Sequence, residues 1–371
     1  MTEVLKSGPS FEVSFRGELP FVLTGALSIL GTAADYEGFD QWIYVTYAAL
    51  SDELRKDITL LFLPLGIPLI LRCLLDQNPD LSDLTSFVGW LSLIDDRVIR
   101  EHVASTLDEL AKKAGGDSAS APAVDDDAGL RDFLLQTTKC AWTDVGERDP
   151  VYFDQLVWLM GRPDELKARL VFTVTRFWEA HYASEYDETR RLIERSVAYH
   201  NRLRYSERLD EVYVSVTGKA LSSHAAETYA QLERLTFIPS CYAGPYAQFI
   251  GLDAGRRNLA LIYNCRPRSG NEDDPNHLLP ALFPPLKALA DETRLEILAI
   301  LADGELYAQQ IVDRLEISQP AVSRHLRLMV AVGILAERRE NGMKFYQVRQ
   351  ETLSGLAQRI ATLAAQGSDE A

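Results

Sequence analysis

Residues 318–329 combine side chains that can read a nucleic acid. With helical spacing, Val322, Leu326 and Met329 fall on one side of this segment and form an apolar face. The other side then carries an amide, hydroxyls and guanidinium groups, which can bond to base edges and phosphates. The polar residues that we predict to contact DNA here are Ser318, Gln319, Ser323, Arg324, His325 and Arg327.

A second polar group follows in a predicted β-hairpin. Asn341-Gly342 is a strong signal for a two-residue turn, and simple register then places Arg339 opposite Lys344 and Arg338 opposite Phe345. Two like charges that face each other are unfavourable in an isolated hairpin, and a nearby phosphate would reverse that effect. We therefore add Arg338, Arg339 and Lys344 to the predicted DNA contacts.

The segments around these residues must position them. Asp291 is placed to cap a leucine-rich helix that ends before Gly304, and a second helix is predicted over residues 307–315. Ser318 is then expected as the N-cap of the next helix, with Pro320 tolerated in its first turn. This order of helices, followed by the hairpin, predicts a winged helix-turn-helix.

Local charge favours DNA as the partner. The chain holds 38 basic and 54 acidic residues, for a net charge of −16, yet residues 314–349 hold seven Arg and Lys against three Glu. A basic segment in an acidic chain is typical of a nucleic-acid reader. The alternative is a scaffold whose winged helix binds protein, because any three-helix core has an outward polar face.

These segments resemble the ArsR/SmtB family of bacterial transcription regulators. The resemblance covers residues 280–366 and implies a DNA-binding and dimerisation domain. It implies a homodimer whose recognition helices enter successive major grooves of an imperfect palindromic operator in double-stranded DNA. It also implies repression, because bound dimers of this family usually occlude a promoter. The matching segments are Leu289-Ala290-Asp291-Glu292-Thr293-Arg294-Leu295-Glu296-Ile297-Leu298, Ser318-Gln319-Pro320-Ala321-Val322-Ser323-Arg324-His325-Leu326 and Gly333-Ile334-Leu335.

The sequence departs from the metal-sensing members of that family at both of their metal sites. Those members carry a Cys-x-Cys before the turn, where soft thiolates hold the ion, and the aligned residues here are Tyr307 and Gln309. The second family site uses an Asp and a His after the wing, where this chain has Gln350 and Thr352. We therefore predict no metal at either site, and no cofactor.

Length and composition indicate a soluble globular protein with two or more domains. The chain has 371 residues, of which 47% are hydrophobic and 25% are charged. The run from Ile58 to Leu71 is too short to cross a membrane and contains two prolines, so a broken core helix is expected. No secretory signal is expected, and the scattered cysteines favour reduced thiols in a cytoplasmic protein. The cysteines are Cys73, Cys140, Cys241 and Cys265.

The rest of the sequence predicts a mainly α fold of the α+β class, with a regulatory N-terminal domain over residues 1–265. Helical patterns dominate it, and from about residue 211 the alternation of Val212, Val214 and Val216 favours a small antiparallel sheet. Two segments are predicted to be exposed connections. They are an acidic loop over residues 115–129 and a linker over residues 266–279.

Trp178, Tyr182 and Tyr186 form an aromatic stripe if the helix through them is continuous. Core packing between helices is the plainer explanation. The functional explanation is one wall of a small-molecule site, because such sites are mostly apolar and aromatic. We keep these three residues as candidates for effector binding.

The first 279 residues contain no phosphate-binding loop, dinucleotide fingerprint, zinc-protease motif or nucleophile elbow. Cys241 or Ser240 could act as a nucleophile with His181 or His200 as base, but nothing in the sequence places these groups together. We therefore predict that the protein is not an enzyme. An N-terminal enzyme fused to an autoregulatory winged helix is the alternative.

Regulation is the role that remains for the N-terminal domain. The first 279 residues hold 28 basic and 42 acidic residues. A body of that charge repels DNA, so we expect it to lie away from the face of the recognition helix that meets the groove. There it could bind a small molecule or a protein and bias the spacing of the two recognition helices.

Overall fold

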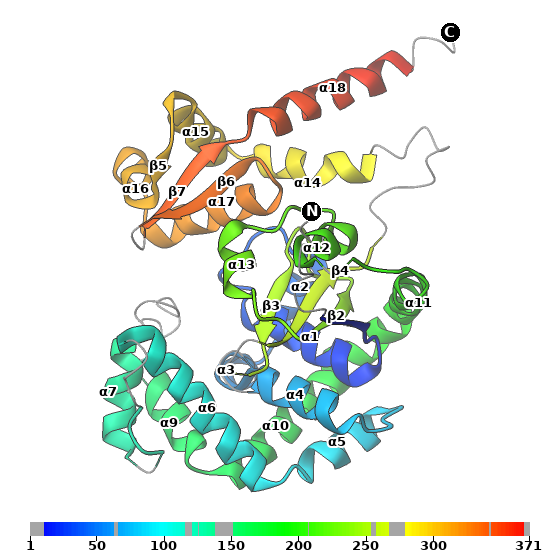
Figure 1. Ribbon diagram of the computed structural model, residues 1–371, viewed down its shortest axis with the longest axis vertical. Helices are drawn as coiled ribbons and strands as arrows, with labels where there is room; N and C mark the ends of the chain where they lie inside the picture. The colour runs from blue at the N-terminus through cyan, green and yellow to red at the C-terminus, as the bar shows by residue number, and fades with distance from the viewer. Residues whose placement is uncertain are drawn as a thin grey trace, which may run out of the picture.

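The structure is a computed structural model that describes residues 11–62, 66–115, 121–124, 126–137, 151–206, 208–253, 257–266, 279–340 and 343–366. These residues form an N-terminal domain up to residue 266 and a C-terminal domain from residue 279, with separate hydrophobic cores (Figure 1). Most of the chain is helical and the sheets are small, which confirms the predicted fold class.

Helix α1 is the centre of the N-terminal domain, because all of its residues are buried between the sheet and the surrounding helices. A helix that is apolar all round is suited to that place. The elements of the domain are β1 (Glu12–Phe15), α1 (Leu19–Gly31), α2 (Gln41–Ala49), α3 (Asp52–Leu61), α4 (Ile67–Gln77), α5 (Leu84–Ser92), α6 (Asp96–Gly115), α7 (Asp127–Thr137), α9 (Tyr152–Met160), α10 (Pro163–Phe177), the π-helical turn η3 (Trp178–Tyr182), α11 (Ala183–His200), α12 (Leu209–Thr217), α13 (Ser223–Thr228), β2 (Arg234–Ser240), β3 (Gln248–Gly251) and β4 (Asn258–Asn264).

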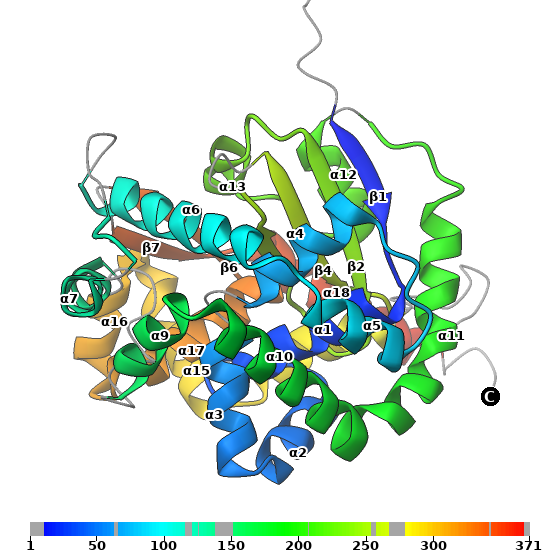
Figure 2. The ribbon, with the colours of Figure 1, turned by 90° about the horizontal axis from the view of Figure 1, so that it is seen from below.

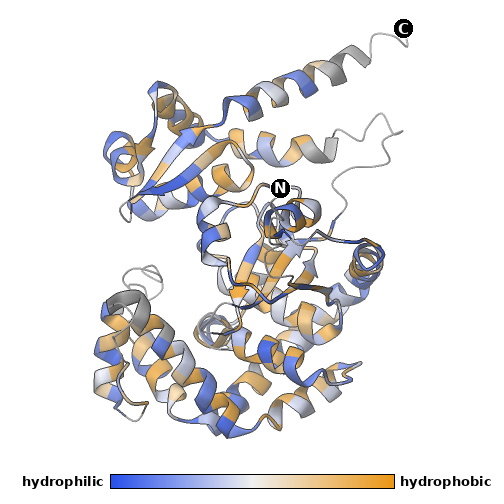
Figure 3. Ribbon diagram, viewed as in Figure 1, coloured by the Kyte–Doolittle hydropathy of each residue, from blue (hydrophilic) through white to orange (hydrophobic). Residues whose placement is uncertain are grey.

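The N-terminal sheet has the order β1-β2-β4-β3 and is mixed, so the predicted antiparallel sheet is wrong. Strands β1, β2 and β4 run parallel, and only β3 runs antiparallel to its neighbour β4. Both faces are covered, because Phe237 on β2 packs in the core shared with α12 while Ile238 packs in the core shared with α1. Mostly apolar strands are expected in such a layer, and Figure 3 shows them in orange.

The segment with alternating valines is helix α12, not a strand. Val212 and Val216 are buried, as either a helix or a strand would allow, because residues four apart share a face in both. In a strand, Val214 would share the buried face of Val212 and Val216, but it is 46% exposed. The break expected in the apolar run from Ile58 to Leu71 is confirmed, since α3 ends at Leu61 and α4 begins at Ile67.

Only part of residues 115–129 forms the exposed loop that the sequence predicted. Helix α7 begins at Asp127, and Ala121 and Val124 pack against the main core. Residues 116–120 and 125 of this loop lie outside the described residues, as do residues 267–278 of the predicted linker. No helix in the described ranges combines the length and apolar character that a membrane span needs.

The C-terminal domain has the predicted order of elements. Asp291 caps α15 by accepting a hydrogen bond from the backbone N–H of Arg294, and Val322, Leu326 and Met329 are buried in its core as expected. The elements are α14 (Leu279–Leu289), α15 (Glu292–Ile300), the 3₁₀ turn η5 (Leu301–Asp303), β5 (Leu306–Tyr307), α16 (Ala308–Leu315), α17 (Gln319–Ala331), β6 (Leu335–Glu340), β7 (Met343–Val348) and α18 (Gln350–Gln366).

Candidate nucleic-acid interface

The N-terminal half of α17 holds four of the predicted DNA contacts. Ser318 occupies the N-cap position with extended backbone, although its side chain makes no capping hydrogen bond. Ser318 and Gln319 are exposed, and Ser323 and Arg324 are half-buried. Arg324 has no hydrogen bond or ion pair to any residue that the structure describes. This end of the helix therefore offers an amide, the Ser318 hydroxyl and an unpaired guanidinium, whereas Ser323 Oγ accepts two hydrogen bonds from Arg327.

The wing formed by β6 and β7 has the predicted register, with Arg339 opposite Lys344 and Arg338 opposite Phe345. Its turn, residues 341–342, lies outside the described residues. Glu337 lies 3.6 Å from Arg339 and 3.2 Å from Lys344, so a carboxylate already offsets the repulsion between these two cations.

Arg338 is also paired. Its guanidinium lies 2.5 Å from carboxylate oxygens of both Glu305 and Glu340 and stacks over the Phe345 ring, 4.5 Å from the centroid. A DNA phosphate that reached the wing would therefore have to compete with three carboxylates for these cations. The sequence did not predict this, because it does not place Glu305 beside the hairpin.

Helix α17 lies on the side of the C-terminal domain that faces the N-terminal domain in Figure 1, and N-terminal helices lie in front of it in Figure 2. The contact is made by its C-terminal half. This half contacts residues 32–40, which we call the α1–α2 loop. The Arg327 guanidinium donates to the Asp35 carbonyl at 2.8 Å and lies over the Tyr36 ring, 4.9 Å from the centroid. Gly38 lies so close to Leu328 that a Cβ at Gly38 would be 2.7 Å from a methyl group of that side chain.

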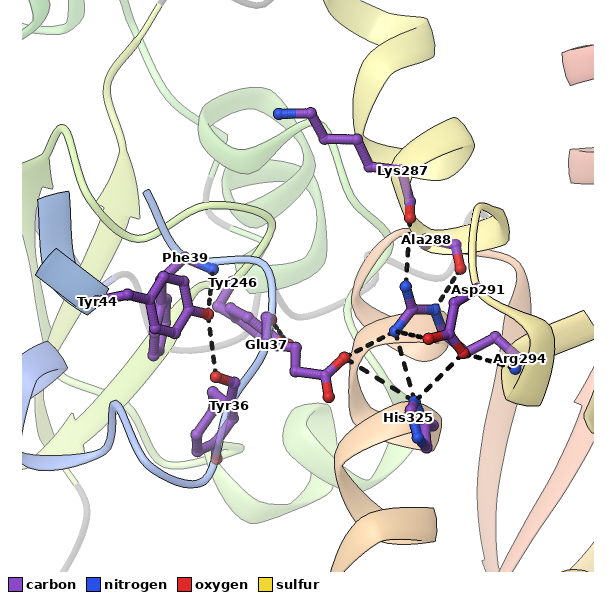
Figure 4. Close-up of polar contacts among 10 residues, drawn as sticks. All are labelled: Tyr36, Glu37, Phe39, Tyr44, Tyr246, Lys287, Ala288, Asp291, Arg294 and His325. Carbon is purple, nitrogen blue, oxygen red and sulfur yellow. Dashed lines mark hydrogen bonds and ion pairs between the residues drawn. The ribbon is translucent and has the colours of Figure 1, made fainter. Parts of the chain in front are cut away.

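Arg294 is the most buried cation of this contact, with 7% of the residue exposed (Figure 4). It donates to the carbonyls of Lys287, at 3.3 Å, and Ala288, which end helix α14 and would otherwise lack partners. Its remaining N–H group donates to the Glu37 carboxylate at 2.7 Å. The α1–α2 loop therefore supplies the nearer counter-charge for a buried guanidinium of the C-terminal domain, and Asp291 of the same domain lies 3.9 Å from that guanidinium.

His325 lies beside the same group. Its Nδ1 is 3.9 Å from carboxylate oxygens of both Glu37 and Asp291, and 3.4 Å from the Arg294 guanidinium. Only 14% of its side chain is exposed. The imidazole points into the contact between the domains (Figure 4), and its role as a DNA contact stays a prediction.

The expectation that the acidic domain lies away from the groove face of the recognition helix is wrong for the C-terminal half of α17. The α1–α2 loop covers the C-terminal half of α17, and Lys219, after α12, donates to the Ala331 carbonyl at 2.6 Å. Net charge decides how a domain behaves toward DNA at a distance. Contacts within 3 Å depend on individual pairs of side chains, such as Glu37 with Arg294. These two residues are 257 positions apart, so the sequence does not show that they meet.

Residues 241–247, the β2–β3 loop, support the α1–α2 loop from behind. The Tyr246 hydroxyl donates to the Glu37 carbonyl at 2.5 Å, and burial raises the pKa of Tyr246, so the hydroxyl keeps its proton. The Asp40 N–H donates to the Tyr242 carbonyl at 3.1 Å. Gly244 has a φ of +57°, and a Cβ there would be 2.0 Å from the Gly38 carbonyl oxygen. Two backbones therefore pack directly against each other.

Trp178, Tyr182 and Tyr186 form a compact cluster rather than a stripe along one helix. The ring centroids of Trp178 and Tyr186 are 5.6 Å apart, and Tyr182 lies within 6.1 Å of both. The π-helical turn η3 interrupts the α-helix at Trp178–Tyr182. Tyr182 is fully buried and also contacts Trp42 and Tyr242. Effector binding by the three residues stays a prediction.

Among the described residues, no hydrogen bond joins Cys241 or Ser240 to His181 or His200. His200 stacks on Phe15 and its Nδ1 is 2.6 Å from the Tyr205 hydroxyl, whereas Cys241 lies beside Cys265, with the sulfur atoms 3.5 Å apart.

The sequence analysis missed the pair Cys241 and Cys265, as well as the pair Glu37 and Arg294. The available signal was that each cysteine directly follows an apolar strand, but which strands are neighbours cannot be read from the sequence.

Comparison with known proteins agrees with the C-terminal architecture. The profile described as "Bacterial regulatory protein, arsR family" matches residues 291–337. The "Arsenical resistance operon repressor" of Staphylococcus aureus is 33% identical over 75 residues, which cover 72% of that protein. The chain belongs to the ArsR family. The resemblance predicted from the sequence motifs is thereby confirmed.

Two further relatives of this ArsR-family chain are named for different regulatory roles. The "Arsenic resistance transcriptional regulator ArsR1" of Pseudomonas putida is 38% identical, and the match covers 20% of this chain and 61% of that protein. The "Transcriptional activator HlyU" of Vibrio cholerae is 35% identical, over 22% of this chain and 77% of that protein. The family profile does not extend into the N-terminal domain of this chain.

Proposed function

We propose that this protein is a sequence-specific, DNA-binding transcriptional repressor, which acts as a homodimer and is controlled through its N-terminal domain by a non-metal signal. The observation that carries the proposal is the division of α17. Its N-terminal half offers Gln319 and Arg324 for base contacts, whereas Arg327 in its C-terminal half is bonded to the α1–α2 loop. We further propose that the N-terminal domain is a sensor and not an enzyme.

The chemistry of the open half is suited to the major groove. A glutamine amide can bond to adenine and a guanidinium to guanine, each through two hydrogen bonds. Lys344 and Arg339 on the wing would contact phosphates, which position a protein on DNA without reading its sequence. Each of these cations would have to give up its ion pair with Glu337 to bind a phosphate, so each adds little to the affinity for DNA.

Exposed apolar residues on α14 and α18 support the homodimer. Phe283 and Leu286 on α14 are 53% and 36% exposed, and Ile360 on α18 is 43% exposed. The two helices contact each other, and α18 lies at the top of the molecule in Figure 1. A two-fold dimer through this surface would bury the apolar residues and present two α17 helices to the half-sites of a palindrome.

Control follows from the competition between two partners for one helix. A major groove about 12 Å wide accommodates a helix with little else beside it. With the α1–α2 loop on Arg327 and Leu328, α17 cannot enter the groove along its full length. A signal that favours separation of the loop from α17 therefore raises operator affinity. The largest possible gain is set by how much more tightly the signal binds the separated arrangement than the covered one.

Fluorescence anisotropy with DNA from the protein's own promoter tests this proposal. We expect tighter binding to the promoter than to a scrambled duplex at near-physiological salt, and sedimentation velocity should show a dimer. Equal, salt-sensitive binding to both duplexes would contradict sequence-specific recognition. A lack of binding even at low salt would favour the protein-binding scaffold instead.

A further inference from the structure

Cys241 and Cys265 meet at the carboxyl ends of two neighbouring strands. Ser240 on β2 pairs with Asn264 on β4, so the next residue of each parallel strand stands directly beside the other. The Cys265 N–H donates to the Ser240 carbonyl at 2.9 Å, which continues the ladder to this position. The two sulfur atoms are 3.5 Å apart.

This geometry permits a disulfide without a large backbone movement. Neighbouring strands are about 4.8 Å apart, and disulfides join Cα atoms about 4.4–6.8 Å apart. The sulfur atoms would have to approach by about 1.5 Å to reach the bond length. Cys241 is buried and Cys265 is half-buried, so Cys265 is the member of the pair nearer to solvent.

The surroundings favour a thiolate at Cys241. A hydrogen bond from the Cys265 thiol and the nearby Arg266 guanidinium lower the pKa of Cys241. Cys73, on α4, is the opposite case, because burial raises its pKa to about 11. Thiolate, not thiol, is the form that reacts with an oxidant.

We propose that Cys241 and Cys265 are a redox modification site, which a small hydroperoxide oxidises to a disulfide, and that this bond loosens the α1–α2 loop from α17. The second half of this inference rests on the proposed function, since it supplies a signal for the control described there.

The reaction balances in two steps. The Cys241 thiolate attacks the terminal oxygen of the hydroperoxide and the O–O bond breaks, which gives a sulfenic acid and an alcohol once the alkoxide takes a proton. The Cys265 sulfur then attacks the Cys241 sulfur, loses its proton and displaces hydroxide, which leaves as water. Two thiols and one hydroperoxide thus become a disulfide, an alcohol and water. A small thiol reductant reverses the change.

Short contacts link the sulfur atoms to the covered half of α17. The Cys241 carbonyl accepts from Arg266 Nε at 3.0 Å, and the same guanidinium lies 3.3 Å from the carboxylate of Asp40. The next residue, Tyr242, accepts from the Asp40 N–H. A shift of Cys241 toward Cys265 therefore displaces the end of the loop whose other residues hold Arg294 and Arg327.

Peptide mapping of the full chain before and after hydrogen peroxide tests the site. We expect a disulfide-linked peptide pair that joins Cys241 to Cys265, reversed by dithiothreitol, while Cys73 and Cys140 remain open to alkylation. The linked pair should be absent in Cys265→Ser and retained in Cys73→Ser. Free or irreversibly oxidised Cys241 and Cys265 in the treated wild type would overturn the proposal.

Hydrogen exchange tests the coupling without DNA. In the oxidised wild type, amides of residues 35–40 and 325–331 should exchange about fivefold faster or more, and in peroxide-treated Cys265→Ser they should not change. A disulfide with unchanged exchange would overturn the coupling and leave the modification site. Failure of both oxidation states to bind promoter DNA would instead contradict the proposed function.

Discussion

The two halves of α17 are one helix with two different partners. Gln319 and Arg324 lie in the half that is open, and Arg327 and Leu328 lie in the half that the α1–α2 loop covers. Both halves share the apolar face that holds the helix to its own domain. The difference teaches that polar residues on the outward face of a recognition helix need not all serve DNA.

Variants in the two halves should change operator affinity in opposite directions. Under the proposed function, changes in the open half should remove contacts to DNA and weaken operator binding. Changes in the α1–α2 loop should remove a competitor of DNA and strengthen operator binding. The shared apolar face affects the folding of the helix itself, so the largest effect belongs there.

Leu326→Ala should lower the unfolding free energy of the C-terminal domain by about 2–5 kcal/mol, because it leaves a cavity in a fully buried position. Hydrogen exchange of α17 amides measures this. Met343→Ala, at a position 46% exposed on the wing, should stay within about 0.5 kcal/mol. Equal effects of the two variants would show that α17 does not depend on this core.

Arg324→Ala should weaken specific operator binding by about 1–3 kcal/mol, because it removes an unpaired guanidinium from the open half. Anisotropy titrations with promoter and scrambled duplexes measure the loss. Arg97→Ala makes the same change of charge in the N-terminal domain, where the side chain is 83% exposed, and should have little effect. Unchanged affinity in Arg324→Ala would remove this residue from the DNA contacts.

Glu37→Gln should act in the opposite direction and tighten operator binding by about 1 kcal/mol. It removes the nearer counter-charge of the buried Arg294, but Asp291 remains 3.9 Å away and Glu37 is itself 36% exposed, which keeps the effect modest. The same titrations measure it, with Glu53→Gln on the exposed surface of α3 as the matched control. Weaker binding in Glu37→Gln would mean that the covered arrangement helps DNA binding instead of opposing it.

Lys344→Ala should have the smallest effect, about 0.5 kcal/mol, since its pairing with Glu337 offsets part of any phosphate contact. The loss should be equal for promoter and scrambled DNA, and the slope of log affinity against log salt should fall by about 1. Lys56→Ala, exposed on α3, is the control. A loss confined to promoter DNA would make Lys344 a base-reading residue.

Local sequence was sufficient where neighbours along the chain decide the structure. The cap at Asp291, the buried positions Val322 and Leu326 and the pairing of Arg339 with Lys344 were all predictable. Each depends on a helical period, a capping side chain or a two-residue turn. Helix α12 was not predictable, because Val212 and Val216 share a face in a helix and in a strand alike.

By itself, then, the sequence determined the winged helix, the polar face of α17 and the family. Only the tertiary structure decided which part of that face is open, that Glu37 meets Arg294, and that Cys241 meets Cys265. These contacts join residues 24 and 257 positions apart. Such pairs form when whole elements pack, and the packing is decided by apolar burial across two cores, not by any signal at the paired residues.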